Sequence, residues 1–382
     1  MQLRVIIKWG TLLSVLLFCL AMSYYAYMRL DMAEHSRKVN LFSLVPSDCV
    51  GVLESHDVEG LLNNRPMLNY GDELERLKFP GLFQLVLEAM HTYSDENVHG
   101  LGDKLNGMLV SFHNPQDFNE QVIYLRVNGN DENMLTDIID EYASESYPVK
   151  EEKYRGERIE IYPLGGDEFL ATYVEKGVLV VSCQKRLVEK VIDAWMDNTS
   201  LDEDAIFSQV KNKRKAKSFV TLYGRFSSIP FLDIPTDCWC EYGFYLNSDV
   251  FYLTGDTYMS DSLSSMELAK HNMQEIPLVK EDGVVISADR DSTVFLTNWA
   301  YDVNETGNRT LFNECVANLS HEADFTLVAD MQKVGEEPER FQEFLPLFML
   351  SNVWLFRPFI LSAQLSLNGG RFTQLWVFTY KN

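Results

Sequence analysis

The sequence predicts an α+β protein: an N-terminal transmembrane helix followed by two lobes of mainly antiparallel sheet with helices. Three observations support this. One apolar stretch without charge runs from Trp9 to Met28. Beyond it, short alternating runs of apolar and polar residues are separated by turn residues, which is typical of antiparallel strands. Amphipathic helical segments are inserted without a regular strand–helix–strand alternation, which favours α+β over a parallel sheet.

The first element is the apolar stretch 9–28, between Lys8 and Arg29. A helix of this length, at about 1.5 Å per residue, covers about 30 Å, the thickness of the hydrocarbon core of a bilayer. A tryptophan at one end and tyrosines at the other suit the membrane–water interfaces. We therefore expect a cytoplasmic tail at 1–8, a membrane anchor at 9–28 with the lipid bilayer as its partner, and a stalk at 29–42.

The orientation of the anchor is predicted from the short tail, because basic residues are nearly balanced on its two sides. We expect a single-pass protein of the inner (cytoplasmic) membrane with its body facing the periplasm. The alternative is a signal peptide cleaved near Cys19–Ala21, which would release the body into the periplasm. A lipoprotein signal through Cys19 is disfavoured, because Phe18 occupies a position that requires a small residue.

The body is strongly acidic. The whole chain has a formal charge of −23, and the 28 basic and 54 acidic residues after position 40 give the body a charge of −26. Affinity for nucleic-acid phosphates and for anionic lipids depends on Lys and Arg side chains. A nucleic-acid partner is therefore disfavoured.

Six cysteines are widely spaced, and five of them lie in the body, so they do not form a disulfide framework. Cys238 and Cys240 flank Trp239 and would share one face of a strand. Such a pair could bind a metal or be redox-active, but no second Cys/His pair has zinc-site spacing. We interpret both as small core residues and predict no cofactor and no metal site.

The first lobe is expected at 43–210. Strands are predicted at 50–54, 107–112, 121–127, 158–162, 168–174 and 178–183. Helices are predicted at 57–62, 74–90, 133–142, 184–196 and 202–210. The basic run 211–217 is interpreted as a solvated link, and the alternative is a patch for an anionic partner.

The second lobe is expected at 211–382 and shows a weak internal duplication. Each copy reads as a strand, a helical connection and a hairpin that turns at an Asn. The first copy comprises 218–223, 242–247 and 250–255, and the second comprises 324–329, 363–368 and 372–377. The copies predict hairpins aligned in one extended sheet or in two packed sheets.

The most apolar part of the body is the segment 340–359. A second membrane span is unsuitable here, because Pro346 breaks the helix and Glu343 and Arg357 bound too short a run. We expect a buried helix and strand. The alternative is an exposed apolar face for a lipid or a protein partner.

From Leu44 onward, the pattern resembles a family of bacterial envelope proteins known only as a domain of unknown function, in versions from bacteroidete-type bacteria. The resemblance rests on Val45-Pro-Ser-Asp48 before a short strand, on the strand 175–182 followed by the helix 184–193, and on the later hairpins. It implies one N-terminal span and a periplasmic α+β body. No activity comes with it.

Gly165, Gly166, Asp167, Glu168 and Phe169 spell the signature of diguanylate cyclases. The rest of that site is missing: no strand supplies the upstream Asp, and the segment 99–103, faintly like the second motif, lies too far away. Gly-Gly-Asp is also a favourable hairpin turn. We therefore interpret the signature as a coincidental hairpin.

Other enzyme signatures are absent from the sequence: it contains no nucleophile elbow, zinc-protease motif, phosphate loop or dinucleotide fingerprint. We therefore expect no catalytic residues. The predicted function is a non-catalytic binding or scaffolding module of the cell envelope, with a hydrophobic concavity between the lobes for a protein or lipid partner. The alternative is a nucleotide enzyme using Asp167 and Glu168.

Overall fold

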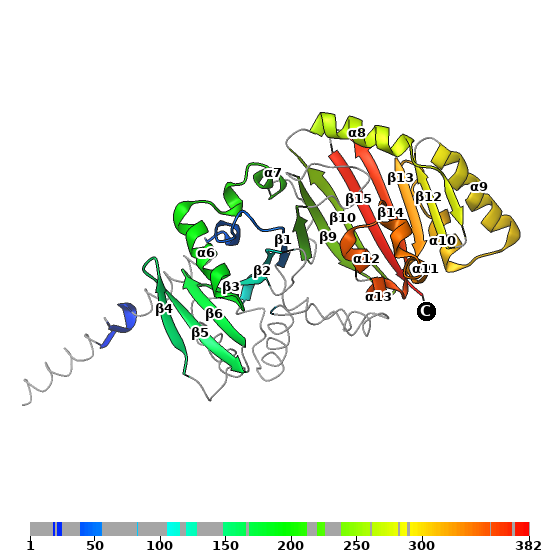
Figure 1. Cartoon of the computed structure of the whole chain (residues 1–382). Helices are drawn as coiled ribbons and strands as arrows, with labels where there is room; N and C mark the ends of the chain where they lie inside the picture. The colour runs from blue at the N-terminus through cyan, green and yellow to red at the C-terminus, as the bar shows by residue number, and fades with distance from the viewer. Residues whose placement is uncertain are drawn as a thin grey trace, which may run out of the picture.

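The structure is a computed structural model, and it describes residues 18–19, 21–24, 39–55, 82, 105–114, 120–127, 148–165, 168–211, 220–225, 238–259, 262–281, 283–288, 291–351, 353–368 and 371–381. The strands form one sheet in which every neighbouring pair is antiparallel (Figure 1). Several helices pack on its two sides. The prediction of an α+β body with a mainly antiparallel sheet is confirmed.

The first half of the sheet has the strand order β1-β2-β3-β7-β6-β5-β4. Its strands are β1 (Gly51–Ser55), β2 (Leu105–Phe112), β3 (Gln121–Val127), β4 (Lys150–Tyr154), β5 (Glu157–Gly165), β6 (Glu168–Glu175) and β7 (Val178–Ser182). A short helix, η1 (Leu41–Ser43), precedes them, and α6 (Lys185–Asp197), η4 (Leu201–Glu203) and α7 (Phe207–Lys211) follow.

The second half has the order β8-β9-β10-β15-β14-β13-β12-β11. Its strands are β8 (Val220–Gly224), β9 (Trp239–Leu246), β10 (Val250–Tyr258), β11 (Val279–Glu281), β12 (Val284–Ala288), β13 (Phe325–Asp330), β14 (Phe359–Asn368) and β15 (Arg371–Tyr380). Its helices are α8 (Ser262–Gln274), α9 (Asp291–Thr306), α10 (Leu311–Ala317), α11 (Met331–Val334), η6 (Pro338–Phe341), α12 (Leu347–Ser351) and α13 (Val353–Phe356).

The two halves share one strand arrangement: in each, the third strand pairs with the last, so β3 pairs with β7 and β10 pairs with β15. The halves meet where β1 pairs with β8, with Leu53 opposite Leu222. The sheet is therefore continuous between them. Of the two arrangements predicted for the later hairpins, β8-β9-β10 and β13-β14-β15 adopt the single extended sheet.

Strand registers assign each residue to one of two sides of the sheet. Paired residues share a side in an antiparallel sheet, and residues two apart on a strand do so as well. Following the pairs places Tyr124, Tyr252 and Val328 on the same side. We call this the α6 side, because α6 packs there against β3, β6 and β7.

The α6 side is buried over most of the first half. Beneath α6, Tyr124, Val180 and Tyr173 form a cross-strand row that packs with Leu187 and Val191 of the helix. In the second half, α9 and α10 cover this side over β12, β13 and β14. The opposite side of the second half holds a large core cluster, to which residues of α8 and α11–α13 contribute, and Figure 1 shows α11–α13 in front of this side.

In the first half, a predicted helix is divided and one strand was not predicted. The helix predicted at 202–210 is divided into η4 and α7, because the Asp204 carboxylate accepts hydrogen bonds from the Ile206 and Phe207 amides and starts a new helix. Strand β4 was not predicted, because its sequence Lys-Glu-Glu-Lys-Tyr has no apolar alternation. Charges of this kind suit its position at the edge of the sheet, since they oppose edge-to-edge association.

The apolar segment 340–359 is largely buried. Phe341, Leu345, Met349 and Phe356 belong to the large core cluster of the second half. The expected single helix is divided among η6, α12 and α13 before β14 begins. Among the side chains of this segment that the structure describes, Trp354 is a large apolar residue that stays exposed, with 55% of its surface accessible.

Within the described residues, no helix combines the length and the apolar character that a membrane crossing requires. Most of the predicted anchor 9–28 lies outside these residues. The predicted helices 57–62 and 133–142 and the link 212–217 also lie outside them, as does the helix 74–90 apart from buried Leu82.

Candidate functional site

Residues 45–49, which precede β1, form a junction where the two halves meet. Pro46 makes a β-bridge with Ser200, and the Leu201 amide donates a 2.7 Å hydrogen bond to the Val45 carbonyl. From the second half, Arg225 donates a 2.9 Å hydrogen bond to the Ser47 carbonyl. The Val45-Pro-Ser-Asp48 motif thus fastens β1 to the segment after α6 and to the end of β8.

Arg225 has two further partners at this junction. Its guanidinium lies 2.7 Å from the Asp204 carboxylate and stacks 4.8 Å from the centre of the Trp239 ring. Phe207 of α7 packs edge-on against the same tryptophan, at a centroid distance of 5.0 Å. These contacts explain why an arginine is needed here, since a guanidinium can pair and stack at once.

Asp48 projects from the junction toward α6 and β2. Its Oδ2 lies 2.5 Å from Lys190 Nζ, and its Oδ1 lies 3.7 Å from His113 Nδ1, which is an electrostatic contact rather than a hydrogen bond. His113, and then Lys190, hold the pKa of the Asp48 carboxyl well below its usual range, although partial burial opposes the shift. Asp48 is therefore an ionised link between helix and sheet.

A polar chain continues from His113 into the core. His113 Nε2 lies 2.9 Å from Ser111 Oγ, which lies 3.2 Å from the Tyr124 hydroxyl. Ser111 and Tyr124 are fully buried, and burial raises the pKa of the tyrosine. The Tyr124 hydroxyl, Ser111 Oγ and His113 Nε2 hydrogen-bond in series, which offsets part of the cost of burying them, whereas His113 Nδ1 has only the 3.7 Å contact with Asp48.

Serine, histidine and aspartate are also the residue types of a hydrolase triad. In that chemistry the serine oxygen must reach a substrate carbonyl, and the aspartate must orient the histidine through a hydrogen bond. Ser111 is 0% exposed, and the His113–Asp48 distance is 3.7 Å. We therefore assign the chain a structural role, joining the junction to β2 and β3.

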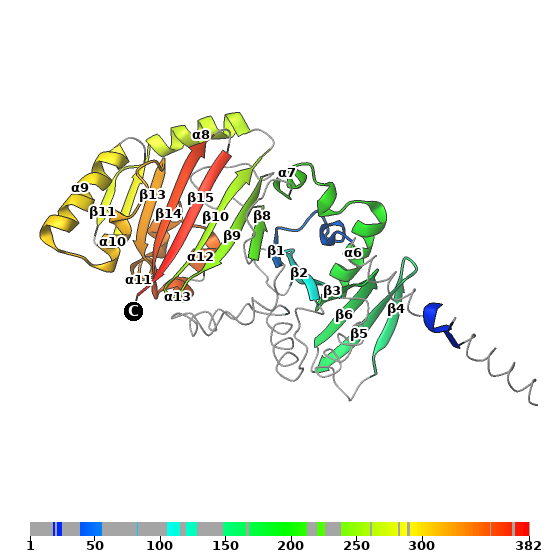
Figure 2. The same ribbon diagram turned by 180° about the vertical axis from the view of Figure 1, so that it is seen from behind.

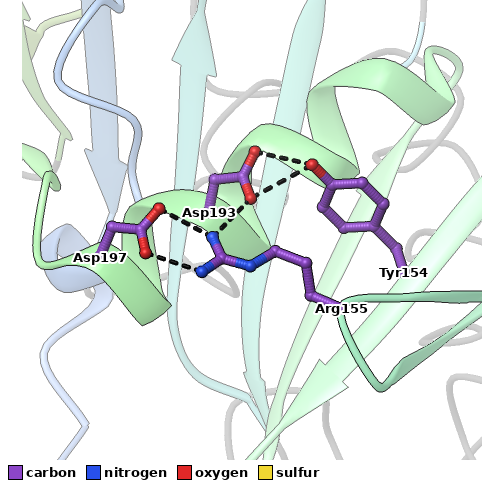
Figure 3. Close-up of polar contacts among 4 residues, drawn as sticks. All are labelled: Tyr154, Arg155, Asp193 and Asp197. Carbon is purple, nitrogen blue, oxygen red and sulfur yellow. Dashed lines mark hydrogen bonds and ion pairs between the residues drawn. The ribbon is translucent and has the colours of Figure 1, made fainter.

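The tip of the β4–β5 hairpin is tied to α6 by an exposed cluster (Figure 3). Arg155 makes two hydrogen bonds of 2.7 Å with the Asp197 carboxylate and one of 2.8 Å with Asp193. The Tyr154 hydroxyl donates to Asp193 at 3.0 Å. Arg155 has a φ of 51° and Gly156 one of 97°, as the tight turn requires. The cluster anchors a hairpin.

The cyclase-like signature lies at the β5–β6 hairpin. Gly165 ends β5, Glu168 begins β6, and the two are paired in the sheet. Phe169 packs against the core of the first half. Gly166 and Asp167 lie outside the described residues, as does the segment 99–103. The predicted hairpin is confirmed, and the rival enzyme interpretation stays a prediction.

Cys238 and Cys240 are fully buried in the core of the second half. Cys240 Sγ lies 3.2 Å from Thr257 Oγ1, which accepts a 3.0 Å hydrogen bond from Gln374. Gln374 in turn accepts hydrogen bonds from Tyr242 and Trp376. The pair thus belongs to a buried polar network across β9, β10 and β15. Among the described residues, no group of three or more His, Cys, Asp or Glu side chains could hold a metal ion.

The α6 side of β9, β10 and β15 is the remaining candidate. We call it the open face and define it by Tyr245, Tyr252, Thr254, Leu375 and Val377, all of them half-buried. The two tyrosine rings stack with centroids 4.8 Å apart, and Tyr252 is paired with Val377. Figure 2 shows these strands with no described helix in front of them. Sequence patterning missed this face, because its alternation resembles that of an ordinary half-exposed sheet.

Comparison with known proteins finds no matching family model and no matching curated protein. One solved structure, crystal form I of TP0453, aligns with 64% of this chain and 90% of its own length. Its sequence identity is 10% and its TM-score 0.26, so the likeness carries no argument about fold or function.

Proposed function

We propose that this chain is a membrane-anchored extracytoplasmic protein whose body is a non-catalytic binding or scaffolding module of the cell envelope. The observation that carries the proposal is the open face. It presents two stacked tyrosines, a leucine and a valine at partial exposure, whereas the polar clusters that resemble active sites hold structural elements together. Aromatic-rich apolar surfaces of this kind are typical of binding sites.

The anchor is the second part of the proposal. Residues 18–19 and 21–24 are helical, and Phe18, Met22 and Tyr24 are 67%, 52% and 67% exposed. Large apolar side chains so exposed on a helix need a hydrophobic surrounding, which a bilayer supplies. In this arrangement the anchor 9–28 holds the acidic body near the outer surface of the inner membrane. The rival is cleavage and release into the periplasm.

Crosslinking in intact membranes tests the proposal. The full chain should fractionate with membranes, resist extraction by high salt and give a discrete crosslinked species with an envelope protein. Recovery of the body in the soluble fraction would support the cleaved form. A membrane-bound chain that gives no crosslinked species across reagents of different length would contradict the binding role.

The diguanylate-cyclase-like alternative rests on Gly165–Phe169 and predicts GTP turnover that Glu168→Ala abolishes. Our proposal expects no turnover by the full chain with Mg²⁺ or Mn²⁺. A reporter fused to the C-terminus distinguishes the two hypotheses further, because it shows on which side of the membrane the body lies. A periplasmic body would lie in a compartment without GTP, whereas a cytoplasmic body would remove the localisation part of our proposal.

A further inference from the structure

The two halves of the sheet differ in what covers their α6 side. In the first half, α6 lies across β3, β7 and β6, the third, last and last-but-one strands. In the second half, the corresponding strands are β10, β15 and β14. Helix α10 reaches β14, but no described helix lies over β15 and the adjoining parts of β10 and β9 (Figure 2).

The surfaces beneath are chemically similar. The pair Tyr124–Val180 joins the third and last strands under α6, and the pair Tyr252–Val377 joins the third and last strands on the open face. Tyr124 and Val180 are 0% exposed, whereas Tyr252 and Val377 are partly exposed. The same kind of cross-strand row is thus sealed by a helix in one half and open in the other.

The open face has the width of a helix. It lies between α7, whose Phe207 packs on Trp239 of β9, and α10, whose Cys315 thiol lies 3.8 Å from Thr379 of β15. Three neighbouring strands span about 10 Å between their outer axes. A helix with its side chains has a diameter of about 10–12 Å, so this three-strand width matches one helix. Helix α7 contacts β9 and β10 at the end that carries Trp239, and α10 reaches β15 near the other end, at Thr379.

The charges around α6 and the open face indicate which side chains a helix bound to the open face would carry. α6 presents its apolar stripe to the sheet, while Lys185, Arg186 and Lys190 beside that stripe each pair with an acid, namely Glu152, Glu120 and Asp48. Asp256 of β10 lies on the same side of the sheet as Tyr252 and Thr254, and the whole body is acidic. A helix with basic residues beside its apolar stripe is therefore complementary to it.

We propose that the open face binds one amphipathic helix of a partner protein, with an apolar stripe over Tyr252, Leu375 and Val377 and Lys or Arg beside it. This inference rests on the proposed binding function and specifies where and what the module binds. Recognition would follow the helix-in-groove mode, in which apolar anchors at helical spacing enter an apolar surface.

Peptide binding to the full chain in detergent provides the test. The probe is a fluorescent 15-residue peptide with the α6 sequence, residues 184–198. One control peptide has the same composition scrambled, and another has its Lys and Arg replaced by Glu. We expect saturable binding of the probe and at least tenfold weaker binding of both control peptides. Val377→Asp should weaken binding of the probe at least tenfold. Tyr301→Asp, at a 63% exposed residue of α9, should leave that binding unchanged.

Absence of saturable binding, equal binding of the scrambled peptide, or binding unaffected by Val377→Asp would overturn the inference. Self-association of the chain that Val377→Asp abolishes would assign the face to a second copy and would also overturn it. Crosslinking in intact membranes keeps the two proposals distinguishable. A partner still captured by the Val377→Asp chain would leave the binding function standing and remove the open face as its site.

Discussion

The two halves of this sheet share a strand order but differ on one side. In the first half, the α6 side is sealed by a helix that is tied down through Asp48 and Arg155. In the second half, the same side is partly open between α7 and α10. The opposite side of the second half is densely packed with aromatic residues, including Phe251 stacked on Phe378. The partly exposed side chains of the open face therefore form a surface of a well-packed half.

The largest effect should come from a matched pair of substitutions, Val180→Asp and Val377→Asp. Val180 is 0% exposed beneath α6, so an unpaired carboxylate there should cost about 3 kcal/mol or more. Val377 is partly exposed, so the same change should cost about 1 kcal/mol or less. Chemical denaturation followed by tryptophan fluorescence measures both. An equal loss of unfolding free energy in the two variants would show that Val377 is buried as completely as Val180, and that the open face is covered.

A smaller effect tests the packing of the covered side of the second half. A Cβ on Gly255 would lie 1.6 Å from the Glu241 carbonyl oxygen, so Gly255→Ala must displace β9 or β10. We expect a loss of about 2–3 kcal/mol. At the control Gly156, φ is +97° and no atom lies within 4 Å of an added Cβ, so Gly156→Ala should cost about 1 kcal/mol through backbone strain alone. A Gly255→Ala chain as stable as the wild type would refute the close approach of the two strands.

The next effect concerns the junction that holds α6. The pKa of Asp48 is lowered in the folded chain, so the ionised carboxyl stabilises the fold above its unfolded pKa. That contribution is lost as the pH falls below about 4 toward the folded pKa. Asp48→Asn should therefore lower stability by about 1 kcal/mol at pH 7 and by progressively less in acid. A stability difference between Asp48→Asn and the wild type that is the same at pH 7 and at pH 3 would contradict this assignment.

The smallest effect should come from the hairpin cluster. Arg155→Ala removes the contacts to Asp193 and Asp197, and should speed amide exchange in β4 and β5 without changing global unfolding. The difference should shrink in 0.5 M salt, because the ions are solvent-exposed. Arg155→Lys should restore part of the protection, since it keeps the charge but loses the bidentate contact. Unchanged exchange in Arg155→Ala would show that the cluster does not hold the hairpin.

Much of the strand pattern was predictable because apolar alternation reports directly on which side of a strand is buried. Strand β3 was predicted with its observed bounds, and β5, β6 and β7 within a few residues. Strand β4 lacked that signal, since an edge strand with a charged sequence buries little. The break at Asp204 was missed because one carboxylate accepting two amides overrides the helical spacing around it.

The candidate surface could not be predicted, because it depends on which strands become neighbours. Tyr245 and Tyr252 stack only when β9 pairs with β10, and Val377 joins them from more than a hundred residues away. The chain Ser111–His113–Tyr124 did carry a local signal: a serine on β2 and a histidine just after the strand, two residues further on, fall on one side when the chain stays extended. Its partner Asp48 is brought in by the junction, which no local pattern specifies.

The most direct test of the central claim is a comparison of tyrosine reactivity in the folded chain. Hydroxyl-radical footprinting should modify Tyr245 and Tyr252 of the open face several-fold faster than Tyr124 and Tyr173, which lie 0% and 2% exposed beneath α6. The α6-sequence peptide should slow the reaction of Tyr252 and leave that of Tyr301 on α9 unchanged. Protection of Tyr245 and Tyr252 equal to that of Tyr124 in the chain alone would contradict the account, because both halves would then be sealed.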